Sequence, residues 1–86
     1  MELKDTVALM FSSDYRERFK AEYYQLQIRA AKLSSMLKAH RNGELNFELS
    51  CPYELLVAQR AFMQCYIDIL ESRAQMEDIR VEDITP

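Results

Sequence analysis

Two adjacent tyrosines, Tyr23 and Tyr24, lie in the one strongly basic stretch of the chain, residues 16–41. This stretch carries seven basic and two acidic residues, whereas residues 42–86 carry three basic and nine acidic ones. An aromatic ring beside a cation suits a nucleobase joined to a phosphate, because the ring stacks on the base and the cation pairs with the phosphate. In a chain of net charge −3, this pattern indicates a local anion site rather than a surface for duplex nucleic acid.

Lys38 is the cation that could complete such a site. It follows Tyr23 by 15 residues, about 22 Å along a helix, so one chain cannot bring both to one small ligand. Two antiparallel copies related by a two-fold axis would place Tyr23 of one beside Lys38 of the other. His40, half a turn after Lys38, would lie near the same ligand and could donate a hydrogen bond to a phosphate or ribose. A histidine at a helix end is, however, more often a simple C-terminal charge.

The same residues also have purely structural interpretations. Adjacent helical residues point about 100° apart, so Tyr23 would be a core residue and Tyr24 would face a partner or solvent. Arg73 interrupts an apolar row later in the chain, and a buried arginine needs a carboxylate or phosphate partner. For Arg73 that partner is either a phosphate or one of three carboxylates, those of Glu22, Asp68 and Glu77.

The elements that position these residues are predicted to be helices. One glycine and two prolines in 86 residues supply almost none of the turns that a sheet requires, so the fold class is all-α. Apolar residues at steps of four and three predict a long helix over residues 15–41, begun by a capping box of Asp14 and Glu17 and ended at Asn42-Gly43. A short helix over residues 2–11 is expected to dock through Leu3, Val7, Met10 and Phe11.

A second long helix is predicted over residues 52–78, with Pro52 at its first helical position. Residues 42–51 form the connection, which we expect to be extended rather than a strand because it has no partner strand. Residues 79–86 form an acidic tail that either folds back or frays. The chain is thus expected to be one helical domain, residues 1–86: a short N-terminal helix and a long antiparallel helical hairpin.

The second long helix carries two adjacent apolar rows, which one partner helix cannot cover. The first row recurs every seven residues, and the second lies beside it: Leu55, Phe62, Ile69 and Met76, then Leu56, Met63, Ile67 and Leu70. The width of this apolar surface predicts that the hairpin dimerises or forms a larger assembly.

Several function classes are disfavoured by the sequence. One glycine excludes phosphate-binding and dinucleotide fingerprints, and one histidine with two separate cysteines gives no metal pattern, so we expect neither an enzyme nor a cofactor. We interpret Cys51 and Cys65 as reduced thiols in the core or at a helix start. With neither a signal peptide nor an apolar run of about 20 residues, a cytoplasmic protein that does not bind membranes is expected.

Parts of residues 16–74 resemble a family of small phage proteins, the anti-CBASS cyclic-oligonucleotide sponges. The likeness rests on an EYxxL motif at residues 22–26 and a QxxxMxxYxxxL motif at residues 59–70. It implies a helical protein assembled as a hexamer of dimers, which holds cyclic dinucleotides at dimer interfaces and, in some members, cyclic trinucleotides at threefold pores. By position, Tyr23 matches the base-stacking tyrosine and Lys38 the lysine from the other protomer; His40 replaces a threonine, Tyr24 replaces a small polar residue, and Arg73 is a candidate for the threefold site.

The sequence therefore supports two possible functions. The first is a phage sponge that binds cyclic nucleotide messengers of anti-phage defence, CBASS or a related system, in the host cytoplasm without cleaving them. The alternative is a helical interaction module whose wide apolar face binds a helix of a host or virion protein.

Overall fold

The fold was obtained as a computed structural model, which describes residues 1–84. It contains a 3₁₀ helix, η1 (Leu3–Thr6), a single turn of α-helix, α1 (Val7–Met10), and two long helices, α2 (Tyr15–Arg41) and α3 (Tyr53–Met76). No strand occurs within residues 1–84. The predicted all-α fold class is therefore confirmed.

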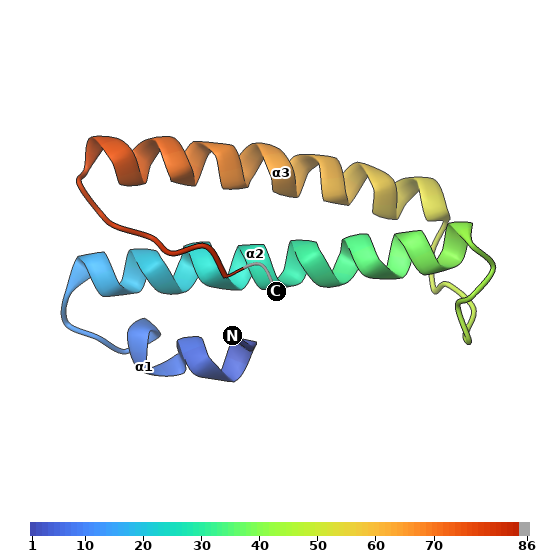
Figure 1. Cartoon of the computed structure of the whole chain (residues 1–86), viewed down its shortest axis with the longest axis horizontal. Coiled ribbons are helices and arrows are strands. Elements are labelled where there is room, and N and C mark those ends of the chain that lie inside the picture. Colours follow the sequence, from blue (N-terminus) through green and yellow to red (C-terminus); the bar gives the residue numbers. More distant parts are fainter. Residues whose placement is uncertain (85–86) are drawn as a thin grey trace.

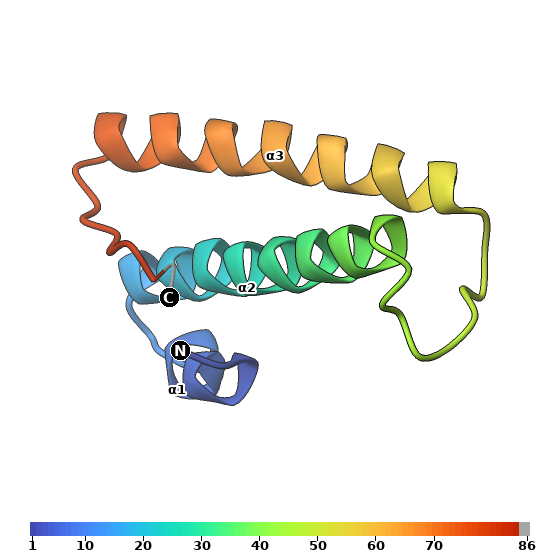
Figure 2. The same cartoon turned by 45° about the vertical axis from the view of Figure 1, so that its right-hand side comes forward.

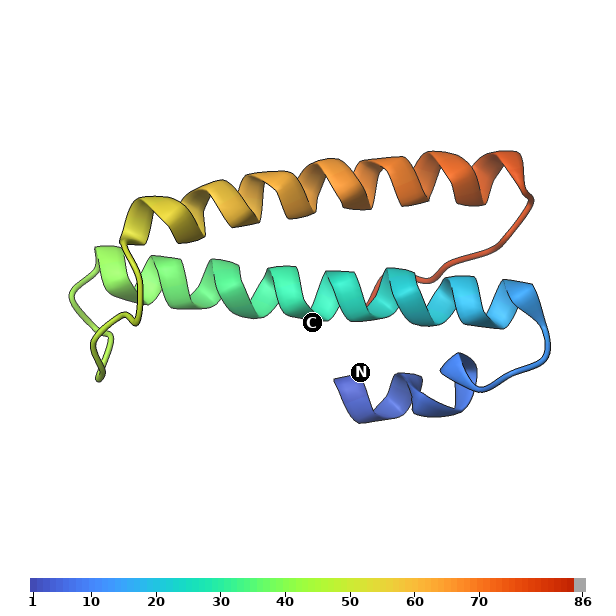
Figure 3. The ribbon, with the colours of Figure 1, turned by 180° about the vertical axis from the view of Figure 1, so that it is seen from behind.

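The two long helices run side by side in opposite directions and are joined at one end by residues 42–52 (Figure 1). The short N-terminal helices lie against α2 on the side away from α3, as the front and rear views agree (Figures 1 and 3). After α3 the chain turns back and runs along α2 toward its middle (Figure 2). Helix α2 is thus the element that every other segment contacts or approaches.

The ends of α2 are fixed by local hydrogen bonds. Asp14 caps the first turn by accepting the Arg16 N–H at 2.9 Å. The expected capping-box bond from Asp14 N–H to Glu17 is replaced: the Ser12 hydroxyl accepts from Asp14 N–H at 3.0 Å and donates to Glu17 at 2.7 Å. At the other end Gly43 adopts a φ of +70°, a left-handed conformation that glycine accepts without strain.

Helix α3 is shorter than the predicted range of residues 52–78. Pro52 has an extended ψ of 140° and serves as the N-cap, so Tyr53 rather than Pro52 is the first helical residue. At the C-terminal end Asp78 adopts a φ of +56°, which ends the helix, and the Ile79 N–H bonds back to the Ala74 carbonyl at 2.8 Å. This turn sends the following residues back across α2.

The core lies in the seam between α2 and α3 and extends under the tail. Leu70 of α3 is completely buried, and its buried or partly buried neighbours come from α2, α3 and the tail: Phe19, Tyr23, Tyr24, Ala30, Ile67, Ala74, Ile79, Val81 and Ile84. The predicted apolar stripe of α2 is thus the one that packs on α3. The tail folds back, as one of the two expected alternatives, through residue 84; residues 85–86 of the expected tail lie outside the described part of the chain.

The N-terminal segment differs from expectation in which residues it buries. Phe11 is largely exposed and Val7 and Met10 are about half exposed, whereas Leu9 packs on the core and Thr6 is completely buried. The Thr6 hydroxyl donates to the Leu3 carbonyl and accepts from Gln25 of α2, which ties η1 to α2. The 3₁₀ turn rotates the chain, so the predicted α-helical face over residues 2–11 does not form.

Of the two cysteines, Cys51 lies at a helix start, one of the two places expected, whereas Cys65 is neither in the core nor at a helix start. Cys51 is half-buried just before α3, but Cys65 is exposed in the middle of α3. In the connection, Phe47 is exposed while Leu45 and Leu49 are partly buried. Neither of the long helices, nor any shorter one within residues 1–84, has the length and apolar character needed to cross a bilayer.

Candidate functional site

Tyr23 lies in the interior, with 4% of its surface exposed. Its hydroxyl donates to Glu71 Oε2 of α3 at 3.0 Å and accepts from Gln27 Nε2 at 2.8 Å. Its ring packs edge-on against Tyr24, with ring centroids 5.8 Å apart. The ring therefore has no free face within this chain on which a base could stack, and the hydroxyl is the part of Tyr23 that reaches a surface.

Tyr24 is buried as well, with 5% of its surface exposed, so the expectation that it faces a partner or solvent is wrong. The reason is the tail, which covers the side of α2 that would otherwise be free. The backbone N–H of Glu82 donates to the Tyr24 hydroxyl at 3.1 Å. A residue 58 positions away in sequence thus occupies the place expected for a second copy or for water.

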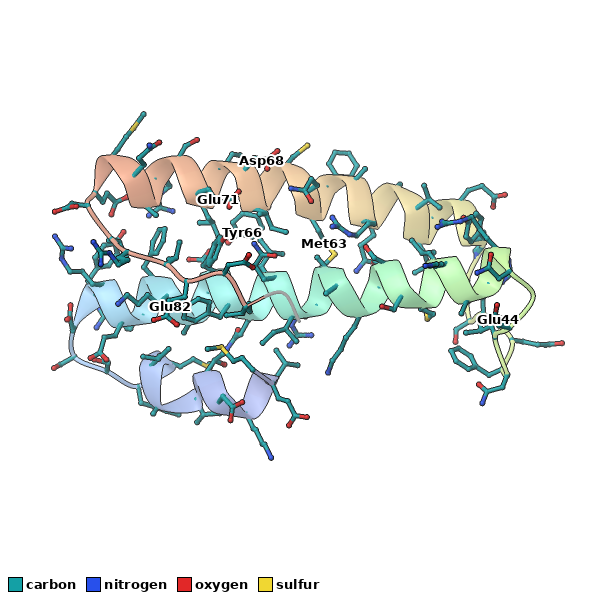
Figure 4. The ribbon with its side chains drawn as sticks, viewed as in Figure 1. Glu44, Met63, Tyr66, Asp68, Glu71 and Glu82 are labelled. Atoms are coloured by element: carbon teal, nitrogen blue, oxygen red, sulfur yellow. The ribbon has the colours of Figure 1, made fainter. Side chains whose placement is uncertain are left out.

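A groove of about 370 Å³ opens beside the Tyr23 hydroxyl, between α2, α3 and the tail. Three of its lining residues are acidic (Figure 4 labels two of them, Glu71 and Glu82), and the full lining is Tyr23, Gln27, Glu71, Val81, Glu82 and Asp83. Burial raises the pKa of Tyr23 above its usual value and so do Glu71 and Asp83, while the bond from Gln27 opposes them. Tyr23 therefore remains a neutral hydrogen-bond donor and acceptor at physiological pH.

The chemistry of this groove is that of hydrogen bonding to hydroxyl and amino groups. Carboxylates accept hydrogen bonds, and the Gln27 amide can both donate and accept, so sugar hydroxyls and base edges fit the lining. A phosphate does not fit it unaided, because the carboxylates repel it. A ligand that carries phosphates would need cations from outside this groove.

Lys38 is exposed in the last turn of α2. Within residues 1–84 its side chain forms neither a hydrogen bond nor an ion pair, and the same holds for the side chains of Arg29 and Lys32. Lys38 and Gln27 are separated by 11 residues, or three turns of α2, so Lys38 points to the same side of the helix as the groove. The structure does not bring Lys38 and Tyr23 together in one chain, because about 22 Å of helix lies between them.

His40 is exposed but lies on a different side of α2 from Lys38. Residues two positions apart in a helix point about 200° apart, so His40 does not accompany Lys38. Its ring instead stacks on Tyr53, the first residue of α3, with centroids 4.8 Å apart and planes 23° apart. Arg41 Nη1 donates to the Tyr53 hydroxyl at 3.2 Å. Tyr53 and Arg41 are not among the site residues predicted from the sequence, although Tyr53 directly follows Pro52, the N-cap of α3.

Arg73 is exposed at the far end of the helix pair and not buried as expected. Its Nε atom donates to Glu77 Oε2 at 3.2 Å, so its partner is one of the three carboxylates considered. Its Nη2 atom donates to the Tyr15 hydroxyl at 2.9 Å, and its guanidinium lies 5.1 Å from the Phe19 ring centroid. These contacts join α3 to the start of α2, and the two hydrogen bonds use two of the five N–H donors of the guanidinium.

Glu77 lies at the centre of a group of polar side chains at this end of the helix pair. We call this group, Tyr15, Arg16, Arg73 and Glu77, the end cluster. The Tyr15 hydroxyl donates to Glu77 Oε1 at 2.7 Å, and this bond, more than the pairing with Arg73, lowers the pKa of Glu77. Arg16 completes the cluster by donating to the backbone carbonyls of Glu77 and Asp78. Residues 1–84 contain no group of three or more histidine, cysteine, aspartate or glutamate residues that could hold a metal ion.

Taken together, the fold defines a small all-α protein in which two long helices share a core with a returning tail. The model of the Sequestin family matches residues 13–76, which is most of the chain, and the chain belongs to that family. The matched range contains α2 and α3 and leaves out η1, α1 and the tail. No curated protein and no solved structure matches the chain.

Proposed function

We propose that this protein is a phage immune-evasion sponge, which binds a cyclic nucleotide second messenger of bacterial anti-phage defence in the host cytoplasm and sequesters it without cleaving it. The proposal rests on the finding that the chain belongs to the Sequestin family, because the family name indicates sequestration. Sequestration needs high affinity and no turnover, since the protein must compete with the effector that the messenger activates.

The ligand site in this proposal is formed by two copies of the chain. Helix α2 presents three residues at spacings of four and seven, Gln27, Ala31 and Lys38, which share one side of the helix. Ala31 is exposed and small, so a second copy of α2 can approach closely and antiparallel there. An axis near Ala31 relates residue 23 of one copy to residue 38 of the other and brings Lys38 to the groove at Tyr23.

Electrostatics support this pairing. The groove at Tyr23 is lined by three carboxylates, whereas Lys38 has no partner in its own chain within residues 1–84. A lysine from the second copy would therefore be attracted to the groove and would supply the positive charge that a phosphate requires. In this arrangement the groove hydrogen-bonds to the sugar or base while Lys38 contacts the phosphate.

The burial of Tyr23 changes the role expected for it. Its ring is covered, so it contributes its hydroxyl rather than a stacking surface. Tyr24 supports Tyr23 from the core, and Arg73 holds the end cluster, so neither contacts the ligand in this proposal. His40 lies outside the cleft, on its stack with Tyr53.

The proposal is tested by thermal unfolding in the presence of cyclic dinucleotides, cyclic trinucleotides and cyclic ADP-ribose isomers. A ligand at 100 times its dissociation constant stabilises the folded state by about 2.7 kcal/mol, which raises the melting temperature by several degrees. Lys38→Ala is expected to abolish the increase. Lys32→Ala is the matched control, because Lys32 is also an exposed α2 lysine without a partner but points to another side of the helix.

An increase that survives Lys38→Ala would place the ligand elsewhere, and the absence of any increase across all three ligand classes would contradict the proposal. In that case the alternative, a module that binds a helix of a host or virion protein, gains support. The observation in favour of this alternative is the exposed apolar row of α3, in which Phe62 is the most exposed aromatic residue.

A further inference from the structure

The outer side of α3 carries an apolar stripe that no described residue of this chain covers. Its four large residues are Leu55, Phe62, Ile69 and Met76, and they are 60%, 74%, 58% and 87% exposed. The residues of α3 that face α2 are different ones, such as Ile67 and Leu70, which are buried. The stripe is thus additional to the core and is free in the folded chain.

The stripe has the spacing of a coiled-coil seam. Its large residues recur every seven positions over three heptads, and three exposed small residues lie between them at steps of three and four: Ala58, Cys65 and Ser72. A strict seven-residue repeat keeps the seam facing one partner helix along its whole length. None of these seven residues is charged. The natural occupant of such a surface is therefore another long helix.

The alternation of large and small residues indicates which partner helix fits the stripe and in which direction that helix runs. In a parallel pair of identical helices, equivalent positions face each other, so Phe62 would meet Phe62 and Cys65 would meet Cys65. In an antiparallel pair, each large residue faces a small one, and the two rows interdigitate without voids. We propose that α3 docks antiparallel on α3 of a second copy of this chain, through the stripe of residues 55–76.

The polar residues beside the stripe favour this occupant over a lipid surface. Interfacial membrane helices carry lysine and arginine along their polar face, but α3 contains no lysine, and its two arginines, Arg60 and Arg73, donate to side chains of α2. Its other charged residues are acidic: Glu54, Asp68 and Glu71. This contact is also distinct from the pairing through α2, since it lies on the outer side of α3 and contains neither Tyr23 nor Lys38. An assembly with both contacts can grow beyond a dimer.

The first test is the mass of the full chain by size-exclusion chromatography with light scattering. Phe62→Glu places a charge in the centre of the stripe, and we expect its mass to be at most half that of the wild type. Phe47→Glu is the control, because Phe47 is exposed in the connection, away from α3. Circular dichroism checks that both variants remain helical. A monomeric wild type, or a Phe62→Glu variant with the wild-type mass, would overturn the proposal.

The second test addresses the direction of the two helices. In chains with Cys51→Ser and Cys65→Ser, one copy carries Ala58→Cys and the other Ser72→Cys. With each large residue facing a small one, position 58 of one copy and position 72 of the other lie within about 6 Å of each other along the helix axis, whereas identical positions lie at least about 15 Å apart. A short bismaleimide should link the mixed pair and neither chain to itself. Links between identical positions would overturn the antiparallel orientation, and neither result depends on a nucleotide.

Discussion

The Tyr23 hydroxyl donates to Glu71 Oε2 at 3.0 Å and so connects the first half of α2 with the second half of α3. The same hydroxyl lines the groove in which we place the sugar or base of a nucleotide. Tyr23 is therefore both a core residue and a surface donor. Variants that separate these two roles are needed before its part in binding can be judged.

Tyr23→Phe is the variant that keeps the ring and removes only the hydroxyl. We expect it to lower the free energy of unfolding by about 1 kcal/mol, because Glu71 is exposed and regains water as a partner. Tyr23→Ala would cost more, about 3–5 kcal/mol, by opening a cavity. Chemical denaturation measures both. Equal losses for the two variants would show that the ring does not pack as described.

The alkaline limb of the stability profile should depend on Tyr23. Its pKa is raised in the folded state, so the folded protein holds the proton more tightly than the unfolded chain. The corresponding stability is complete below the unfolded pKa of about 10 and is lost as the pH rises through the folded pKa. The wild type should therefore lose stability above pH about 10 more steeply than Tyr23→Phe. Parallel profiles would contradict the assignment.

The acid limb should depend on Glu77. Its pKa is lowered in the folded state, first by the bond from Tyr15 and then by Arg73. The stability linked to Glu77 is therefore present above the unfolded pKa of about 4.3 and is lost as the pH falls through the folded pKa. Glu77→Gln should be less stable than the wild type at neutral pH and less sensitive to acid. A variant with unchanged acid sensitivity would argue against the end cluster.

Leu70 is the most completely buried hydrophobic residue within residues 1–84. It is completely buried between α3 and α2, so Leu70→Ala should cost about 2–5 kcal/mol. Ser13→Ala, an exposed change in the link before α2, should alter stability by less than about 0.5 kcal/mol. Thermal unfolding of the two variants side by side gives the comparison. A small effect at Leu70 would mean that the seam between the helices is loosely packed.

The sequence predicts the long helices well because their signals are local. The period of the apolar residues defines α2, and Asn42-Gly43 ends it where the left-handed turn occurs. The predicted start of α3 at Pro52 is one residue too early, because proline is compatible with both the N-cap and the first helical position. The N-terminal segment is harder to predict from sequence, because a partly buried hydrogen bond from Gln25 to Thr6 selects a 3₁₀ turn in place of the expected helix.

The candidate site could be predicted only in part, because it depends on long-range contacts. Nothing in the neighbourhood of Tyr24 indicates that Glu82 will cover it. The acidic groove likewise forms from α2, α3 and the tail together. By contrast, the exposure of Lys38 follows from its place on the helix, and the pairing of Arg73 with Glu77 follows from their separation of four residues.

The central claim, capture of an intact messenger, has a direct test. The protein is incubated with a cyclic nucleotide that raises its melting temperature, free ligand is separated by ultrafiltration, and the retained fraction is then heated to unfold the protein. We expect the nucleotide to be absent from the first filtrate and to return chemically unchanged after heating. A nucleotide that stays free, or that returns linearised or hydrolysed, would contradict sequestration.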